Sequence, residues 1–171
     1  MRQVIVTPYQ TSWADAFQQE KEQLETIFGN RLLAVHHIGS TSVPGLSAKP
    51  ILDILPVVDS LDGIEAFDAA MEQIGYEAKG EFGMPGRRYY RKGGDNRTHH
   101  IHLYADGNPE IMRHVVFRDY LRQHPQEVEA YSTIKERLAR QYPEDISAYI
   151  AGKDSFVKMM EQRALAWWSH D

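Results

Sequence analysis

Cysteine is absent from the 171-residue sequence. Its absence excludes disulfide bridges and thiolate metal ligands, and it fits the reducing conditions of the cytoplasm. Long apolar runs are absent as well, because no window reaches the roughly 18 apolar residues that a membrane-spanning helix needs. The N-terminal stretch MRQVIVTPYQ does not show the pattern of a signal peptide. We therefore expect a cytoplasmic protein that does not contact a membrane.

A surplus of positive charge is absent too. The chain has 19 lysines and arginines against 24 aspartates and glutamates, which gives a formal net charge of -5. Binding along a nucleic-acid backbone needs many cationic side chains, so this balance argues against a nucleic-acid partner, although it leaves room for a local basic pocket. Hydrophobic residues (42%) and charged residues (25%) are in the proportion of an ordinary globular protein, and the length fits one domain.

The hydrophobic pattern changes along the chain from mixed to purely helical. Alternating or continuous apolar stretches predict strands, and stretches with a period of 3.6 predict helices. Strands are expected at residues 4–9, 31–39, 49–58 and 97–107, with a hairpin at residues 77–94. Helices are expected at residues 11–28, 60–75, 109–123, 126–141 and 146–168. The predicted fold class is α+β, with a mixed β-sheet, flanking helices and a C-terminal helical region.

The helical last third is expected to act mainly as a scaffold. We predict an α/β core at residues 1–107 and a helical part at residues 108–171 that packs on it, so that the chain forms one compact unit. Lys153 and Lys158 of this part are within reach of a triphosphate in some arrangements of the helices. Trp167 and Trp168 are expected in the core or in the contact of a homodimer.

A loop rich in glycine and serine leads directly into a strand with one charged residue. Gly39 permits a tight turn, and the amides after it can point at an anion together with the Ser40 hydroxyl. Lys49 stands at the exit of this loop. Asp53 has only apolar neighbours, so its carboxylate needs a hydrogen bond, an ion pair or a metal. The segment is either a polar connection with a structural carboxylate or a phosphate-binding turn beside a metal ligand.

Four stretches together resemble the GrpB family of nucleotidyltransferase-like proteins: HHIGSTSVPGLSAKPILDI, PGRRYYRKG, RTHHIHLY and FRDYLRQHP. The resemblance implies a nucleotidyltransferase-like fold in which Gly39 and Ser40 hold phosphate. It also implies a divalent metal (Mg, Mn or Zn) on Asp53 and gives catalytic roles to Asp53 and Ser40. Active members of that superfamily usually place two acids at alternate strand positions. Here Ile51 and Leu55 occupy those positions, so the second carboxylate of a two-metal site is missing.

Two histidines on a later strand offer a replacement for the missing carboxylate. In a strand, His100 and His102 share one face, and His99 lies on the other. Their neutral imidazoles can ligate one divalent metal together with Asp53 or Glu81. These ligand types favour Zn, Mn, Ni or Fe over Mg. The alternative is a pair of hydrogen-bonded surface histidines.

The predicted hairpin carries three arginines that are candidates for binding phosphate. Alternation places Arg87 and Arg91 on one face and Arg88 on the other. A guanidinium binds phosphate or carboxylate through two parallel hydrogen bonds. Together with Lys49, these side chains are therefore candidates for nucleotide binding. The alternative is a solvated hairpin whose cations pair with surface acids.

The sequence predicts a nucleotidyltransferase-like enzyme that uses a divalent metal on a nucleotide or another phosphorylated small molecule. Two other functions stay open. One is a non-catalytic module that binds an anion or a nucleotide. The other is a metal-dependent hydrolase built on His100, His102 and an acidic ligand. The partners of Asp53 distinguish them, because a second acid favours transfer and two histidines favour a transition-metal site.

Overall fold

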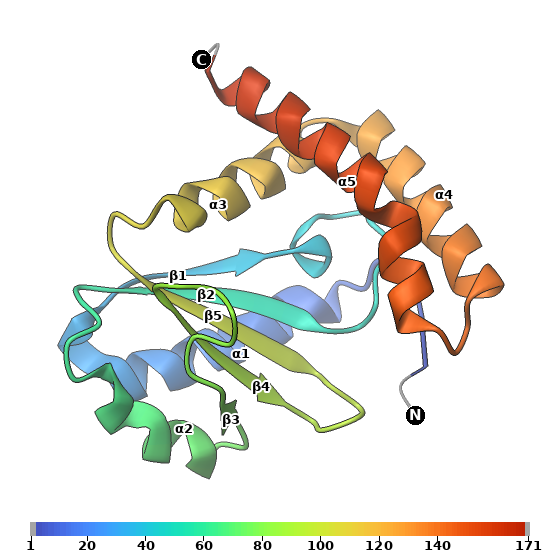
Figure 1. Ribbon diagram of the computed structural model, residues 1–171. Helices are drawn as coiled ribbons and strands as arrows, with labels where there is room; N and C mark the ends of the chain where they lie inside the picture. Colours follow the sequence, from blue (N-terminus) through green and yellow to red (C-terminus); the bar gives the residue numbers. More distant parts are fainter. Residues whose placement is uncertain (1–2, 170–171) are drawn as a thin grey trace.

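A computed structural model describes residues 3–169 and shows one five-stranded sheet covered by helices (Figure 1). The strands are β1 (Leu32–Ile38), β2 (Leu52–Val58), β3 (Glu77–Ala78), β4 (Arg87–Lys92) and β5 (His99–Ala105), in the spatial order β1-β2-β5-β4-β3. β2 and β5 run parallel, and the other neighbours are antiparallel. The predicted α+β fold with a mixed sheet is confirmed.

The helices of the described residues begin and end where local chemistry favours it. They are α1 (Ser12–Phe28), α2 (Asp68–Gln73), α3 (Pro109–Arg122), α4 (Pro125–Gln141) and α5 (Ile146–Ser169). α3 and α4 each begin with a proline, which suits a first turn because its amides have no acceptor within the helix. α1 ends at Gly29, whose φ of 55° is a left-handed value that glycine adopts without strain.

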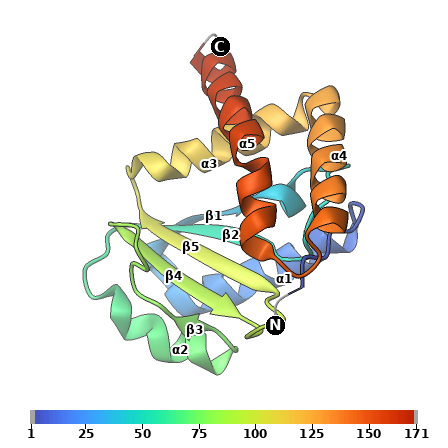
Figure 2. The ribbon, with the colours of Figure 1, turned by 45° about the vertical axis from the view of Figure 1, so that its right-hand side comes forward.

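Different helices cover the two faces of the sheet. α1 and α2 lie on one side of it, and α3, α4 and α5 lie on the other (Figures 1 and 2). Ile54 of β2 and Ile101 of β5 are buried on the first side together with Phe28 of α1. Leu55 of β2 is buried on the second side with Ile111 of α3. Alternate side chains of β2 therefore enter two separate apolar layers, and polar residues of the second face lie toward the C-terminal helices.

The C-terminal helices also pack against the loop that follows β1. Val43 and Leu46 of this loop are buried in one cluster with Leu121 of α3, Val128 of α4 and Met160 of α5. This packing brings α4 and α5 close to the turn at residues 39–40. The predicted boundary at residue 107 falls between β5 and α3, and the division of the chain into two parts stays a prediction.

The two tryptophans near the end of α5 have different surroundings. Trp167 packs edge-on against Tyr120 of α3, with 5.8 Å between the ring centroids. Trp168 is 50% exposed, and the homodimer to which it was assigned stays a prediction. Among residues 3–169, none of the helices has the length and apolar character that crossing a membrane requires.

Two predicted elements differ from the structure. The strand at residues 4–9 is wrong: of these described residues only Thr7 forms a bridge, to Ala48, and Pro8 lacks the amide that a longer ladder needs. The helix at residues 60–75 is shorter than predicted. Gly63 has a left-handed φ of 66°, and a 3-10 turn (Ile64–Phe67) precedes α2. The glycine interrupts the helical backbone that the apolar periodicity suggests.

Candidate metal and phosphate site

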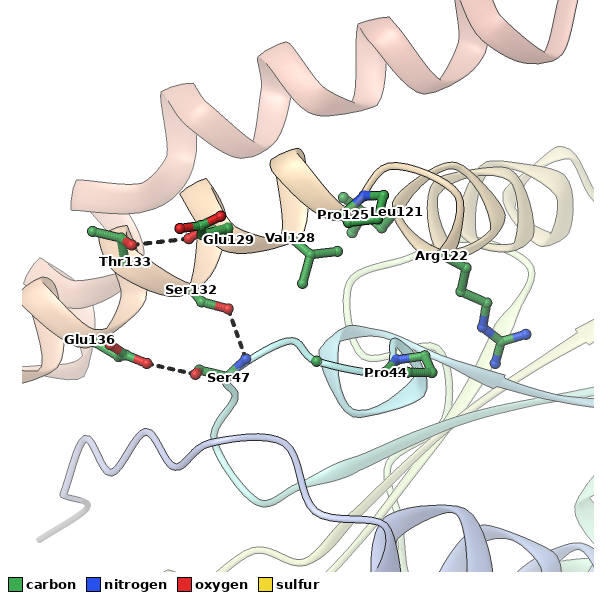
Figure 3. Close-up of a pocket in the computed structure, with 11 residues that line it drawn as sticks. Pro44, Ser47, Leu121, Arg122, Pro125, Val128, Glu129, Ser132, Thr133 and Glu136 are labelled. Atoms are coloured by element: carbon green, nitrogen blue, oxygen red, sulfur yellow. Dashed lines mark hydrogen bonds between the residues drawn. The ribbon is translucent and has the colours of Figure 1, made fainter.

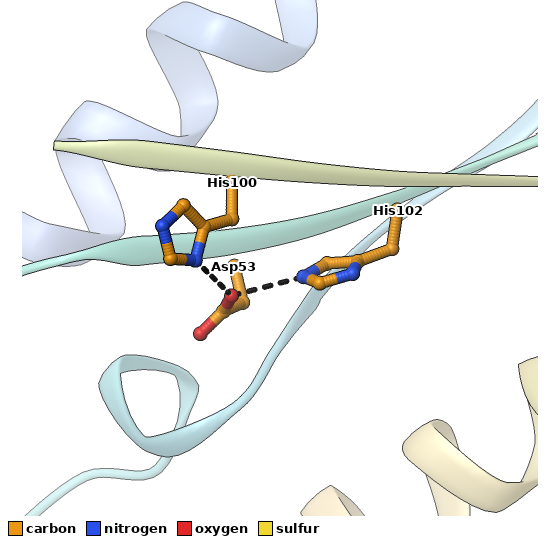
Figure 4. A group of neighbouring side chains, drawn as sticks. All are labelled: Asp53, His100 and His102. Atoms are coloured by element: carbon orange, nitrogen blue, oxygen red, sulfur yellow. Dashed lines mark hydrogen bonds and ion pairs between the residues drawn. The ribbon is translucent and has the colours of Figure 1, made fainter. Parts of the chain in front are cut away.

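The register between β2 and β5 places one carboxylate beside two imidazoles (Figure 4). Asp53 is the parallel partner of His100, and His102 lies two residues further along the same face of β5. The Oδ1 atom of Asp53 is 3.0 Å from His102 Nε2 and 3.4 Å from His100 Nδ1. His100 and His102 thus share one face, as the strand alternation predicts, and both face the strand aspartate.

Packing from β4 fixes the orientation of the two imidazoles. The ring centroid of Tyr89 is 5.7 Å from that of His100 and 5.6 Å from that of His102. Tyr89 is only 6% exposed, so it has little freedom to move away. His99 lies on the opposite face, where its Nε2 atom is 3.8 Å from Oε2 of Glu20. The strand therefore separates two histidines of the site from one that belongs to the α1 side.

The two histidines keep the Asp53 carboxylate ionised. Burial raises the pKa of Asp53, but hydrogen bonds from His100 and His102 lower it by more, so the pKa lies well below its usual range. The side chain is still 29% exposed, which leaves it accessible to a ligand. A permanently charged carboxylate next to two imidazoles is a favourable place for a cation.

The three side chains fit a divalent transition metal. One ligand atom from each of Asp53, His100 and His102 lies within 4.8 Å of the other two. Two ring nitrogens and one oxygen suit Zn, Mn, Fe or Ni better than Mg, which prefers oxygen ligands. The second ring nitrogen of His100, Nε2, is buried and has no hydrogen-bond partner among the described residues. The protein alone therefore does not satisfy this imidazole.

The turn after β1 closes directly over Asp53. Gly39 has a φ of 71°, in the left-handed region. A Cβ atom at this position would lie 2.7 Å from Asp53 Oδ2, so any other residue would collide with the carboxylate. The short helical turn Ser40–Ser42 follows, and in Figure 4 this cyan turn faces Asp53. Glycine, serine and strand aspartate are thus neighbours in space.

A cavity of about 140 Å³ opens beside this turn. Its polar lining consists of Ser40, Lys49, Asp53, His100, Lys135 and Lys153. Three of these side chains are lysines and one is an acid, so basic groups outnumber acidic ones in the cavity. Such a lining favours a small anion, and a phosphate group offers the charge and the acceptor oxygens that lysine and serine bind.

Lys135 of α4 reaches the Gly-Ser turn although only 2% of the residue is exposed. Its Nζ atom contacts Ser40 Oγ and lies 3.3 Å from the backbone oxygen of Ser47. Burial, with repulsion from Lys153 and Lys49, holds the pKa of Lys135 well below its ordinary value. An anion in the cavity would favour the charged form of this amine.

The other two lysines of the cavity approach it beside one aromatic ring. The amines of Lys49 and Lys153 are 5.3 Å and 5.1 Å from the ring centroid of Tyr149, which is fully buried. Burial lowers the pKa of Lys153, and the nearby Asp53 carboxylate opposes that effect. The position of Lys153 is one that the sequence left open, whereas Lys49 was a candidate from the start.

Sequence reasoning missed Lys135. It lies on the buried stripe of α4, four residues after Tyr131 and three before Leu138, and each of these neighbours is 4% exposed. A lysine in the middle of a helical apolar stripe is a signal that could have found it, because a buried amine needs a partner or a ligand. Lys158, in contrast, is 70% exposed and pairs with Asp154 at 2.9 Å.

The structure does not bring Glu81 to the group of metal-ligand candidates. Glu81 lies in the loop between β3 and β4, where its Oε2 atom accepts a hydrogen bond of 2.8 Å from the Gly86 amide. The same oxygen is 3.8 Å from Arg88 Nη1. Closure of the loop uses this carboxylate and keeps it away from Asp53, so the structure gives no support to Glu81 as a metal ligand.

Two arginines of β4 have acidic partners outside the cavity. Arg91 pairs in register with His100, so it shares the face of the site, and its Nε atom is 3.2 Å from Glu77 Oε2. Arg88 lies on the opposite face and pairs with Glu65 at 2.7 Å. These contacts match the alternative in which hairpin cations pair with surface acids.

Arg87 is held by its own hairpin. It shares the face of Arg91, its guanidinium lies 4.8 Å from the ring centroid of Tyr89, and its Nη2 atom donates to the Phe82 carbonyl at 2.9 Å. The cations that line the 140 Å³ cavity are lysines rather than these arginines. Phosphate binding by Arg87, Arg88 and Arg91 stays a prediction.

The fold of the chain is nucleotidyltransferase-like. The chain is similar to the structure of Cid1 in complex with its short product ApU, with a TM-score of 0.53 and 12% identity, over 78% of this chain and 42% of that one. At this identity the similarity shows the fold alone. The chain belongs to the GrpB family, because the family model described as GrpB protein matches residues 3–163.

Several relatives of the family are similar over nearly the whole chain. The crystal structure of conserved protein GrpB from Enterococcus faecalis has a TM-score of 0.92 and 46% identity, over 96% of this chain and 99% of that chain. UPF0157 protein YqkA of Bacillus subtilis is 49% identical over 166 residues, which are 97% of this chain and 48% of YqkA. This chain therefore spans about half the length of YqkA. UPF0157 protein PA4798 of Pseudomonas aeruginosa is 37% identical, over 98% of this chain and 70% of that protein.

Proposed function

We propose that this chain is a metal-dependent nucleotidyltransferase that acts on a nucleotide or another phosphorylated small molecule. The observation that carries the proposal is the cavity beside Asp53, where three lysines and the Ser40 hydroxyl surround a single carboxylate. A phosphoryl group in this cavity meets several cationic donors at once. Phosphoryl transfer depends mainly on such positioning and on stabilisation of the charge that develops in the transition state.

Each polar side chain of the cavity has a role in this reaction. Ser40 and Lys135, which contact each other, donate hydrogen bonds to the non-bridging oxygens of the phosphoryl group. Lys49 and Lys153 neutralise the negative charge of the phosphates. Charge-assisted hydrogen bonds of this kind are about twice as strong as neutral ones. These contacts accelerate the reaction by the amount by which they are stronger in the transition state than in the bound substrate.

Asp53, His100 and His102 are the residues that would hold the divalent metal. When bound, the metal supplies Lewis-acid polarisation of a phosphoryl oxygen. Asp53 contributes a negative charge that persists at neutral pH, because its pKa lies well below the usual range. Tyr89, packed beside both imidazoles, keeps their nitrogens directed at the carboxylate.

Hydrolysis of a phosphoester is a second candidate, and the composition of β2 favours it. Leu55 occupies the alternate position after Asp53 and is fully buried and apolar, so it supplies no second carboxylate for a two-metal site. The partners of Asp53 are two histidines. Mixed sets of histidine and carboxylate ligands serve water activation in metal-dependent hydrolases. In this reaction water takes the place of the acceptor hydroxyl.

A turnover assay with labelled nucleoside triphosphates tests the proposal. The protein is incubated with Mn²⁺ or Zn²⁺, each of the four ribonucleoside triphosphates labelled at the α-phosphate, and a mixture of small alcohols and sugars. We expect label to enter an acceptor product. Asp53→Asn should abolish the product, and Ser40→Ala should lower the rate by about 100-fold, the usual effect of removing one transition-state donor. Lys158→Ala changes an exposed lysine on α5 that does not line the cavity, and this variant should react normally.

The other outcomes of this assay discriminate between the functions. Release of labelled nucleoside monophosphate and of pyrophosphate without an acceptor product, sensitive to Asp53→Asn, supports hydrolysis and contradicts transfer. Binding of triphosphate without turnover under every condition contradicts both enzymes and leaves the anion-binding module. An unchanged rate in Asp53→Asn contradicts the assignment of the site itself.

A further inference from the structure

The cavity beside Asp53 is too small for a whole nucleotide. It measures about 140 Å³, whereas pockets for small-molecule ligands normally measure roughly 300–1,000 Å³. A phosphate group fills such a volume together with a few ordered waters, each of which takes about 30 Å³. The remainder of any phosphorylated substrate must therefore lie outside the cavity, in a neighbouring part of the surface.

A larger pocket adjoins the cavity at the edge where β2 and β5 begin. It measures about 650 Å³. It shares two lining residues, Lys49 and Ile51, with the 140 Å³ cavity beside Asp53, which is named the phosphate cavity here. A substrate whose phosphate contacts Lys49 from one side can thus continue past the same side chain into the larger pocket. The shared residues make the two spaces consecutive parts of one surface.

The pocket in Figure 3 does not offer this continuity. It measures about 470 Å³ and lies between the loop after β1 and α4, with Pro44, Val128 and Thr133 among its lining residues. None of its lining residues also lines the phosphate cavity. Ser47, one of its lining residues, is tied to Glu136 and Ser132 by hydrogen bonds. Both pockets are within the usual size range of ligand sites. The connection to the phosphate cavity, rather than size, therefore selects the 650 Å³ pocket as the substrate pocket.

One wall of the 650 Å³ pocket is a tight turn between β4 and β5. The Asn96 amide donates to the Gly93 carbonyl at 2.9 Å, and a Cβ atom on Gly93 would lie 2.3 Å from the Asn96 oxygen. The carbonyl of Thr98 accepts a hydrogen bond of 2.9 Å from the Leu52 amide, which ties the turn to β2. These bonds hold the backbone of the turn in place, and the exposed side chains of Asp95 and Asn96 lie on the rim of the pocket.

The opposite parts of this pocket are apolar. Ile5, Pro50 and Ile51 line it, and Ile5 is 52% exposed, so its apolar surface is available to a ligand. Apolar surfaces of this kind pack on the faces of a ring, while amide and carboxylate groups bind ring nitrogens and hydroxyls at its edges. Asp95 and Arg97 both line this pocket and their charges offset each other, whereas the smaller cavity has three lysines against one acid, so the phosphate end is better placed beside the lysines.

We propose that the 650 Å³ pocket between Ile5 and Asn96 binds the nucleoside portion of the substrate while the phosphate of the substrate occupies the phosphate cavity. This inference rests on the proposed function and names the substrate as a nucleotide. Ile5, Pro50 and Ile51 contact the base and the sugar, Asn96 and Asp95 bind their polar edges, and Lys49 lies at the junction with the phosphate.

Binding measurements that compare pyrophosphate with nucleoside triphosphates test this assignment. Calorimetry with Mn²⁺ is carried out on the wild type and on Asn96→Trp, in which an exposed side chain is enlarged to fill the pocket. We expect the affinity for triphosphates to fall by at least about tenfold, equivalent to 1.4 kcal/mol, and that for pyrophosphate to stay within about twofold. Ile5→Trp, which fills the pocket from the opposite wall, should act in the same way. Thr133→Trp, which fills the pocket of Figure 3 instead, should leave both affinities unchanged.

Three results would overturn the inference. One is that wild-type protein binds pyrophosphate and every triphosphate equally, because the nucleoside then adds nothing. Another is that triphosphate binding is unchanged in both pocket-filling variants. The third is that pyrophosphate and triphosphate binding fall together, which would assign the effect to the phosphate cavity. Failure of the wild type to bind pyrophosphate at all would be different, since it contradicts the phosphate site of the proposed function.

Discussion

At the scale of single residues, the Asp53 side chain lies so close to the backbone of Gly39 that only glycine fits at position 39. The left-handed φ of 71° at Gly39 and the distance of 2.7 Å from its hypothetical Cβ to Asp53 Oδ2 are independent constraints. The first concerns the backbone alone, and the second concerns the carboxylate of the site. The backbone effect and the carboxylate effect can therefore be separated by comparing Gly39 with a second glycine that has a left-handed φ but open space around it.

We expect Gly39→Ala to lower the free energy of unfolding by about 2–4 kcal/mol, because left-handed strain and the collision with Asp53 add together. Pyrophosphate binding should be lost as the carboxylate moves. Gly63→Ala is the matched control: φ is 66° at Gly63, but no described atom lies within 4 Å of the added Cβ. It should cost about 1–2 kcal/mol and leave binding intact. Denaturant unfolding and calorimetry measure both quantities, and equal behaviour of the two variants would contradict the proposed contact.

His37 makes the folded state sensitive to acid. It is 7% exposed, its ring stacks on Phe17 at 4.8 Å, and its Nε2 atom is 2.9 Å from Thr41 Oγ1. Burial, with repulsion from Arg122, lowers the pKa of His37 from 6.5 to about 4. The unfolded chain therefore binds a proton that the folded chain excludes. The stability that this group contributes is complete above pH 6.5 and is lost as the pH falls toward 4.

Between pH 6.5 and 4, protonation linked to His37 should lower the free energy of unfolding by about 3 kcal/mol. In His37→Gln this contribution should disappear. A contribution from His114, whose pKa burial also lowers to about 4, should remain. Urea unfolding at a series of pH values measures the slope. If the variant and the wild type lose stability in parallel over this range, His37 is not the group responsible.

Sequence reasoning was successful for residues whose geometry is fixed by a local pattern. His100 and His102 share a face because strand side chains alternate, and this rule needs no knowledge of the tertiary fold. Lys135 was missed because its position depends on how α4 packs against the loop after β1. Glu81 was proposed as a ligand because it is acidic and near the sheet. The loop conformation in which the Glu81 carboxylate accepts a hydrogen bond from the Gly86 amide could not be predicted from the alternation of strand side chains.

At the scale of secondary-structure elements, α4 carries an amine on its buried face. Lys135→Met replaces this amine with an apolar side chain of similar size. We expect the free energy of unfolding to rise by about 1–2 kcal/mol, because the desolvated amine is removed. Affinity for pyrophosphate should fall at least about tenfold, the effect of one lost charge-assisted contact. Chemical denaturation and calorimetry measure these opposite changes.

Lys158→Met serves as the control for this experiment, because the Lys158 side chain is 70% exposed on α5. It should change neither stability nor pyrophosphate binding by a measurable amount. A Lys135→Met protein that is less stable than the wild type and binds pyrophosphate normally would show that the amine is structural. It would then have no part in phosphate recognition.

The C-terminal helices were predictable to within a few residues. Their apolar periodicity, with Pro109 and Pro125 at the starts of α3 and α4, is encoded in each segment by itself. The strand at residues 4–9 was predicted wrongly, because strand formation requires a partner as well as apolar residues. Only Thr7 of that segment finds one, in Ala48.

At the scale of the whole molecule, the 140 Å³ cavity beside Asp53 is formed only where distant segments meet. Lys135 and Ser40 are in contact although they are 95 positions apart in the sequence. Lys153 comes from α5 and His100 from β5. Hydrophobic periodicity predicts each helix and strand, but it does not predict that these elements approach one another in the fold. The family resemblance supplied the fold and the glycine-serine-aspartate arrangement, whereas the lysine lining required the three-dimensional structure.

Binding of an anion in this cavity should stabilise the whole fold. A ligand that binds only the folded state at 100 times its Kd adds about 2.7 kcal/mol to the free energy of unfolding. We expect pyrophosphate to raise the melting temperature of the wild type. Potassium chloride at the same ionic strength should raise it less, because chloride has neither the charge nor the geometry of a phosphate group. Equal shifts with the two salts would contradict a specific phosphate cavity.

We propose that Asp53, His100 and His102 hold a divalent transition metal beside the 140 Å³ cavity. Equilibrium dialysis against Mn²⁺ or Zn²⁺, followed by elemental analysis, tests it directly. We expect one metal ion per wild-type chain and none in the double variant His100→Gln, His102→Gln. His99→Gln, altered on the opposite face of the same strand, should still bind one ion. Absence of metal from the wild type, or the same metal content in the double variant, would contradict the claim.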